Sequence, residues 1–302
     1  MAPPQRLMTT DGSGDWVTLY PAIPDIHLIV KTRMFRDTLI ATGVGVESDW
    51  VDRLCQAWET KVIELLDSLV NGTYVQKAVM SAIKQRCADK KYKVIIYPRE
   101  YHPRNTPSGG TNEYEVIDQI LNSAADGATK GGIGVPAQGE SAIVYFDPEP
   151  WRSDSFVRQE AFIVDPNRWG GVGMEADQNL LHELVHALRR LRGVTDRTPT
   201  KTYAYRNLEE FACVLITNIA TNEKNPGTLL RNGERAFVAM PPEYRTSAGY
   251  LQNPEHRDLV KKIVDRDPNF ARDIANSPYP NPFNPVRRHL RGALWSGQMA
   301  DW

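Results

Sequence analysis

The chain has 302 residues, of which 41% are hydrophobic and 24% charged, enough to bury a core in one large domain or two small ones. Its formal charge is −1, so no overall attraction to nucleic acid or to an anionic membrane is expected. The three cysteines are far apart and form no Cys-x-x-Cys pair, so they indicate neither a disulfide framework nor a thiolate metal cage, and a reducing compartment fits best. No apolar run approaches the roughly 18 residues that span a bilayer, and the N-terminus lacks the apolar core of a signal peptide.

The N-terminal third predicts a flexible arm, a small sheet and two helices. Residues 1–15 are rich in Pro, Gly, Ser and Thr, and we expect no regular structure there. The β-branched and aromatic runs "WVTLY", "IHLIVKT" and "TLIATGVGV" are typical of strands. Apolar residues at helical spacing predict a long helix over residues 48–72 and a shorter one over 75–87, before a strand within 92–97.

The rest of the chain predicts a long excursion, one strand and several helices. Residues 103–139 are dense in Gly, Pro, Asn and Ser and are expected to form a surface excursion, with a short helix at "EYEVIDQIL". The apolar run at residues 141–146 predicts a strand, and the "DPEP" after it stops the strand. Further helices are expected over 207–221 and 254–264. The proline-rich tail "SPYPNPFNPVRRHLRGALW" is expected to be extended.

The stretch "NLLHELVHALRRLRG", residues 179–193, is the first that indicates a chemical site. On a helix, His182 and His186 lie on one face one turn apart, so both imidazoles can reach a single ion, with Glu183 beside them. The flanking leucines and valine predict a buried helix, where these polar groups would be costly without a partner. A metal ion would satisfy them; the alternative is two core histidines hydrogen-bonded to backbone.

A catalytic zinc usually takes three protein ligands and leaves one position for water. Arginine stands at positions 189 and 192, where the metzincin pattern would need glycine and histidine, so that class is excluded. Downstream, "YAYRNLEEFACVLITNIATNE" predicts a helix with two adjacent carboxylates, Glu209 and Glu210. Either carboxylate is a candidate ligand; the alternative is a solvated helix start, where acidic residues favour the helix dipole.

This arrangement resembles the gluzincins, zinc peptidases in which a glutamate on a following helix completes a His-Glu-x-x-His site. Glu210 with Cys213 three positions on is similar to the "Glu-Phe-x-small" pattern of the anthrax lethal factor catalytic domain. That resemblance implies Glu210 as the third ligand and Glu209 as the fallback, or as a carboxylate that orients a histidine. "HELVHALRRLRG" followed by "NLEEF" also resembles bacterial effector zinc proteases that are injected into host cells; the match covers residues 177–223.

The resemblance implies an α+β, zincin-like metallopeptidase domain that is helix-rich, with a small mixed sheet and an edge strand above the active-site helix. The run "SAIVYF" is placed in the sequence to be that strand and to pair with a peptide substrate. With Zn²⁺ held by His182, His186 and Glu210, Glu183 would be the general base. Tyr203 has the offset of the lethal factor tyrosine that donates to the oxyanion, whereas Tyr205 is more typical of a packed aromatic.

The sequence therefore predicts a zinc-dependent endopeptidase acting on a specific protein target, a secreted bacterial effector or toxin. We expect a protein or peptide substrate and a secretion apparatus or chaperone as partners, but no nucleic acid and no membrane insertion. The protein would be cytoplasmic in the producer and injected into a target cell without a classical signal peptide. Residues 16–90 would form an N-terminal β/α region packed on a catalytic domain of residues 91–302 with an extended tail.

Three alternatives stay open beside this prediction. A deformylase also uses His-Glu-x-x-His, but its third ligand is a cysteine in a glycine-rich turn, and Cys213 lies in an apolar helix. A non-enzymatic binding protein could carry the motif by accident or hold a structural zinc. A toxin could carry a separate N-terminal receptor module, which truncation at about residue 90 would test.

Overall fold

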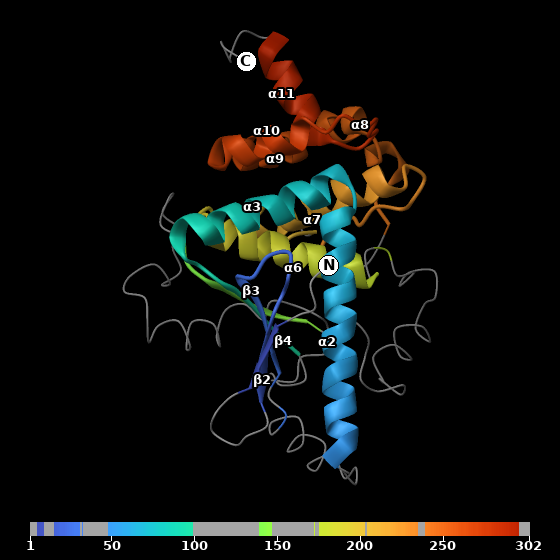
Figure 1. Ribbon diagram of the computed structural model, residues 1–302. Coiled ribbons are helices and arrows are strands. Elements are labelled where there is room, and N and C mark those ends of the chain that lie inside the picture. The colour runs from blue at the N-terminus through green and yellow to red at the C-terminus, as the bar shows by residue number, and fades with distance from the viewer. Residues whose placement is uncertain are drawn as a thin grey trace.

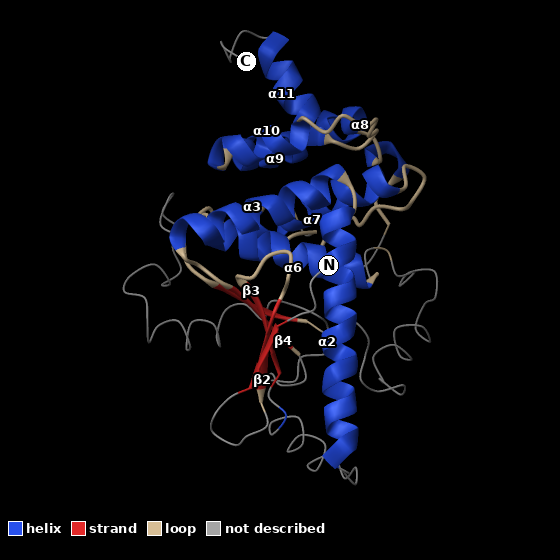
Figure 2. Cartoon of the chain, in the orientation of Figure 1, coloured by secondary structure: helices blue, strands red, loops and turns tan. Residues whose placement is uncertain are grey.

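The computed structural model describes residues 5–8, 15–30, 32, 48–98, 139–146, 172, 175–202, 204–234 and 239–295. These residues form an α+β protein with eight α-helices, a short 3-10 helix η2 (Pro242–Tyr244) and a mixed five-stranded sheet (Figures 1 and 2). None of the helices in these ranges is long and apolar enough to cross a membrane. The expected strand at "TLIATGVGV", the excursion at 103–138 and its short helix lie outside the described residues.

The sheet has the strand order β1-β2-β3-β4-β5. Its strands are β1 (Gln5–Met8), β2 (Trp16–Leu19), β3 (Ile26–Val30), β4 (Val94–Tyr97) and β5 (Ala142–Tyr145). The first three are antiparallel neighbours, whereas β4 runs parallel to both β3 and β5. Parallel neighbours need a crossover connection, and helices α2 (Ser48–Asn71) and α3 (Tyr74–Lys90) lie in the connection between β3 and β4. The strands predicted for β2 to β5 are confirmed.

The two long N-terminal helices are confirmed close to their predicted limits. In α2 the apolar face buries Trp58, Val62 and Leu66, as the helical spacing requires. In α3 the side chain of Thr73 accepts from the N–H of Gln76, whose own side chain accepts from the N–H of Thr73. This reciprocal capping box satisfies two of the backbone donors that every helix start leaves unpaired.

Apart from α2, which runs alongside the sheet, the described helices form two layers on one side of the sheet (Figure 1). The inner layer contains α3, α6 (Ala176–Leu191) and α7 (Leu208–Lys224), with α6 in contact with β5, α2, α3 and α7. The outer layer contains α8 (Ser247–Gln252), α9 (Pro254–Arg266), α10 (Pro268–Ala275) and α11 (Pro285–Trp295). The helices predicted for α6, α7 and α9 are confirmed, while α8 and α10 were not predicted.

Two predictions at the chain ends are wrong in part. Residues 5–8 of the expected flexible arm form β1, although all four are exposed. Backbone pairing with β2 holds this strand, and Arg6 pairs with the buried carboxylate of Glu59 and stacks on Trp16. In the tail, Pro285 begins helix α11 instead of extending the chain. Proline is well suited to the first turn of a helix, because the N–H that it lacks has no partner there.

One hydrophobic core cluster extends through these layers. It joins apolar side chains of the sheet, α2, α3, α6, α7 and the C-terminal helices. The strands on either side of residue 90 belong to the same sheet, because β3 pairs with β4. The division into residues 16–90 and 91–302 stays a prediction, and the shared core supplies the contacts between the two parts.

Candidate metal centre

Helix α6 carries the His-Glu-x-x-His motif between the sheet and α7. The one-turn spacing of His182 and His186 brings their rings together, with centroids 4.8 Å apart and planes nearly perpendicular at 82°. Glu183 lies between them in sequence, and all three residues are buried, at 7%, 6% and 7% exposed for His182, Glu183 and His186. Polar groups at such positions need hydrogen-bond partners, because they are shielded from bulk water.

Helix α7 brings a carboxylate to the two rings. Oε2 of Glu210 lies 3.5 Å from Nε2 of His182 and 3.5 Å from Nε2 of His186, and these two nitrogens are 3.2 Å apart. The start of α7 positions Glu210, because the side-chain oxygen of Asn207 accepts from its backbone N–H at 3.0 Å. Its second carboxylate oxygen, Oε1, accepts from Arg206 at 3.2 Å. Three possible ligand atoms thus face one another.

Glu209 faces the other side of His186. Its Oε1 lies 3.3 Å from Nδ1 of His186, while its Oε2 accepts from Nε of Arg189 at 2.8 Å and from the backbone N–H of Asp196 at 3.1 Å. Consecutive residues on a helix point about 100° apart, so the two glutamates reach opposite nitrogens of one ring. Glu209 therefore has the place of a carboxylate that orients a metal-binding histidine, whereas Glu210 has the place of a ligand.

The charges around the site suit a cation. Burial alone would raise the pKa of Glu209 and Glu210, but the Arg189 guanidinium beside Glu209 and the imidazoles beside Glu210 outweigh it, so both pKa values lie below the ordinary value. Burial lowers the pKa of His182, so its ring is neutral at pH 7. Ionised carboxylates and a neutral imidazole are the protonation states that metal binding requires.

A second group at the same place consists of His186 Nδ1, Glu209 and Cys213. The Cys213 sulfur lies 3.1 Å from Nδ1 of His186. Burial raises the pKa of the Cys213 thiol, so the thiol stays protonated at neutral pH and is a poor ligand. The fixed positive charge of Arg189, 2.8 Å from Glu209, also opposes a second cation. Of these two groups, His182, His186 and Glu210 is the better candidate.

The donor set of that group fits a metal ion. The ligand atoms of His182, His186 and Glu210 all lie within 4.8 Å of one another and are buried. Two imidazole nitrogens and a carboxylate oxygen form an N, N, O set, which zinc commonly takes in proteins. A neutral imidazole presents one nitrogen lone pair, so one cation among the three atoms would satisfy both rings and the carboxylate together. This buried group of two histidines and a glutamate could bind a metal ion.

The structure describes one of the two tyrosines that were considered as oxyanion donors, Tyr205, but not the other, Tyr203. Tyr203 lies outside the described residues, so its role as an oxyanion donor stays a prediction. Tyr205 is a packed aromatic: it is buried, meets Phe211 edge-to-face at 5.0 Å and shares a hydrogen bond with the side chain of Tyr250. Burial raises the pKa of Tyr205 to about 12.

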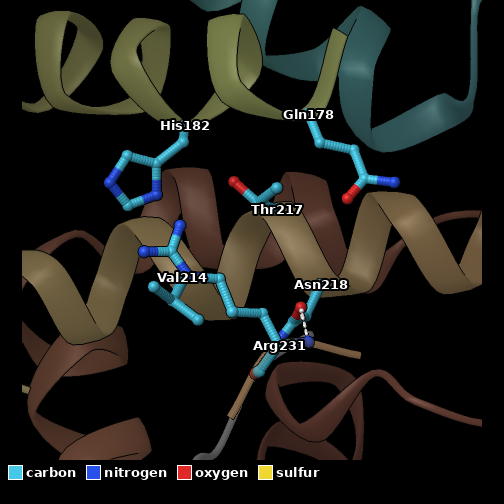
Figure 3. A pocket seen from close by; sticks show the side chains of 6 residues that line it. All are labelled: Gln178, His182, Val214, Thr217, Asn218 and Arg231. Atoms are coloured by element: carbon cyan, nitrogen blue, oxygen red, sulfur yellow. Dashed lines mark hydrogen bonds between the residues drawn. The ribbon is translucent and has the colours of Figure 1, made fainter. Parts of the chain in front are cut away.

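A small pocket opens beside His182, between α6 and α7. Figure 3 shows Gln178 and His182 entering it from α6 and three side chains from α7, with Arg231 closing the lower side. The side-chain amide of Asn218 holds the backbone of Arg231, accepting from its N–H at 3.0 Å and donating to its carbonyl at 2.7 Å. Burial lowers the pKa of Arg231, and Glu210 and Glu183 lie close enough to counter that effect. The residues that line the pocket are Gln178, His182, Val214, Thr217, Asn218 and Arg231.

Strand β5 approaches α6 from the sheet. Among the described residues it is the last strand of the sheet, with β4 on one side. The chain enters β5 across the end of α6: a Cβ on Gly139 would stand 1.6 Å from the Leu191 carbonyl oxygen, so only glycine fits there. Glu140 then pairs with Arg190 at 2.8 Å. The position of β5 next to α6 is the geometry that the expected edge strand needs.

Sequence reasoning missed the arginines that surround the site. Arg189 was noted only because it excludes a metzincin, yet it holds Glu209. Arg206, just before α7, pairs with Glu210 in its first turn, and the four-residue spacing of this pair is visible in the sequence. Arg231 follows α7 in an irregular segment, and no pattern in the sequence indicates that it reaches His182.

The fold and the site together define a helix-rich α+β protein with a buried cluster of histidine, glutamate and cysteine side chains suited to a metal ion. The chain matches no protein-family model, no curated protein and no solved structure. The likeness to gluzincins therefore depends on the motif residues alone.

Proposed function

We propose that this protein is a zinc-dependent endopeptidase with a zincin-like catalytic domain. The observation that carries the proposal is the approach of His182 Nε2, His186 Nε2 and Glu210 Oε2 to within 4.8 Å, from two buried helices. A His-Glu-x-x-His helix with a glutamate on the following helix is the ligand pattern of the gluzincins. The Glu209–Arg189 pair behind His186 supports it, because metal-binding histidines usually donate to such a carboxylate.

In this proposal the chain supplies ligands, a base and a place for the peptide. A Zn²⁺ held by His182, His186 and Glu210 would lower the pKa of a water molecule to near neutrality and polarise the carbonyl of the peptide bond to be cleaved. The carboxylate of Glu183, next to the ligand His182, accepts a proton from the attacking water and passes it to the leaving amine. Arg206 holds Oε1 of Glu210, which leaves Oε2 to face the histidines. An extended peptide alongside β5 would pair with the strand backbone.

Metal content and hydrolysis test the proposal together. Purified protein should contain one zinc per chain, and His182→Ala and His186→Ala should lose it. Glu183→Gln should keep zinc and the folded state but lose hydrolysis, because the change removes a base and no ligand. The exposed Glu175→Gln, just before the same helix, is the matched control and should keep both. Unchanged zinc in both histidine variants would refute the site; zinc without any hydrolysis would favour a binding protein with a structural metal.

The target and the delivery route are a further part of the proposal. The motif resembles injected effector proteases, and the three cysteines form no disulfide among the described residues. We propose that the protein cleaves one or a few cytosolic proteins of another cell. Sequencing of new protein N-termini in a recipient-cell lysate, treated with wild type or Glu183→Gln, should reveal one or two dominant cleavages. A broad spectrum of new termini would instead indicate general digestion.

A further inference from the structure

The two histidines of the centre differ in the surroundings of Nδ1, the ring nitrogen that does not face Glu210. Nδ1 of His186 faces Glu209 at 3.3 Å. Nδ1 of His182 is buried and has no hydrogen-bond partner among the described residues. A histidine that binds a metal through Nε2 carries its proton on Nδ1, and almost always donates that proton to a carboxylate, a carbonyl or a water. His182 therefore needs an acceptor that is neither Glu209 nor Glu210.

A second buried polar atom shares the pocket with this nitrogen. Within the part of the chain that the structure describes, the hydroxyl of Thr217 is also buried without a hydrogen-bond partner. Both residues line the pocket in Figure 3, where the hydroxyl faces the imidazole. The two residues are 7% and 8% exposed, so neither group is solvated in bulk water. A buried donor or acceptor that stays unpaired destabilises the folded protein, so two such atoms in one pocket indicate a shared partner.

Neither Arg231 nor Asn218, which also line the pocket, can be that partner. The guanidinium of Arg231 has only donors, so it cannot accept from Nδ1–H, and its charge disfavours a second cation. The amide of Asn218 is already engaged with the backbone of Arg231. A water molecule can accept one hydrogen bond and donate another, and small polar pockets with two to four partners hold such waters.

We propose that Thr217 is a positioning residue for His182, acting through a water molecule in this pocket. The water accepts from Nδ1–H of His182 and donates to Oγ1 of Thr217. This bridge keeps the proton on Nδ1 and leaves the Nε2 lone pair facing Glu210 and His186. The inference rests on the proposed function, because it takes His182 to be a metal ligand. His186 is thus oriented by a charged carboxylate and His182 by a neutral hydroxyl.

Zinc affinity, measured by competition with a chromophoric chelator, tests this bridge. Thr217→Val keeps the shape of the side chain but removes the hydroxyl, and should weaken zinc binding about 10-fold, the lower end of what such outer partners contribute. Thr217→Ser keeps the hydroxyl and should stay within about two-fold of wild type, since the bridge persists. Thr221→Val removes an equally buried hydroxyl from the next turn of α7, outside the pocket, and should leave the affinity unchanged.

Thermal unfolding of the metal-free variants separates a loss of positioning from a loss of fold. If Thr217→Val does not fold, Thr217→Ala makes the same comparison with a smaller side chain. Wild-type affinity in a folded variant that lacks the hydroxyl would overturn the inference while leaving the zinc site intact. Equal weakening in Thr221→Val would overturn it as well, because the effect would then be structural. Absence of zinc binding in the wild type would instead be the failure of the proposed function.

Discussion

At the scale of single residues, the two adjacent glutamates of α7 have different tasks. Glu210 faces Nε2 of both histidines, whereas Glu209 is held between Nδ1 of His186 and the guanidinium of Arg189. Removing a ligand abolishes stoichiometric metal binding, whereas removing the partner of a ligand only weakens it. The two carboxylates can therefore be told apart by measurement.

We predict that Glu210→Gln loses stoichiometric zinc. Glu209→Gln should keep zinc at saturating metal, with affinity lowered about 10- to 100-fold. It should also lower the free energy of unfolding by about 3 kcal/mol or more, because Arg189 would be left as an unpaired buried charge. Metal titration and urea unfolding measure the two effects. Loss of zinc in Glu209→Gln but not in Glu210→Gln would make Glu209 the ligand.

The sequence is sufficient to find the His-Glu-x-x-His motif but not to choose Glu209 or Glu210 as the third ligand. His182, Glu183 and His186 can be grouped because helical spacing alone places them on one face. Glu209 and Glu210 point about 100° apart, so the choice depends on how α7 approaches α6, which no local pattern encodes. Thr217 lies on the predicted ligand helix, but a single threonine there carries no metal-binding signature. Arg231 lies in an irregular segment after α7, and no pattern in the sequence places it in the same pocket as His182.

At the scale of elements, the residue that caps α7 also positions the proposed ligand Glu210, so the stability of this helix and its metal affinity should change together. Asn207 caps α7 through the N–H of Glu210. Asn207→Ala should lower the free energy of unfolding by about 1 kcal/mol and also weaken zinc binding, since it frees the backbone of Glu210. Asn253 caps α9 in the same way, so Asn253→Ala should cost similar stability without changing zinc affinity. Asn207→Ser should retain the cap and the zinc affinity. Equal zinc affinity in all three variants would show that the cap of α7 does not influence metal binding.

The elements that sequence patterns misjudged are those held by distant contacts. Strand β1 has no buried side chain, so no alternation indicates a strand; pairing with β2 and the Arg6–Glu59 contact hold it. In the tail, the closely spaced prolines predict an extended chain, but Pro285 is the first residue of α11. The long helices and the apolar strands were predictable, because their own apolar spacing matches the faces that they bury.

At the scale of the whole molecule, the N-terminal elements and the metal-bearing helices share one core. Strand β3 pairs with β4, and α3 packs against both α6 and α7. We predict that residues 91–302 expressed alone will not fold, because β4 would lose a neighbour and α6 part of its cover. Circular dichroism, limited proteolysis and zinc content check this against the full chain. A fragment that melts cooperatively and holds zinc would show that the N-terminal part is a separate module.

Because α6 lies at the centre of the molecule, its backbone should become exposed to solvent only when the whole protein unfolds. Every residue from Leu180 to Leu188 is buried, and the helix contacts the sheet and three other helices. Its backbone amides should therefore exchange with deuterium only in global unfolding, and not in local fluctuations. The histidines would then separate from each other no more often than the whole molecule unfolds. The lifetime of the site would equal the lifetime of the fold.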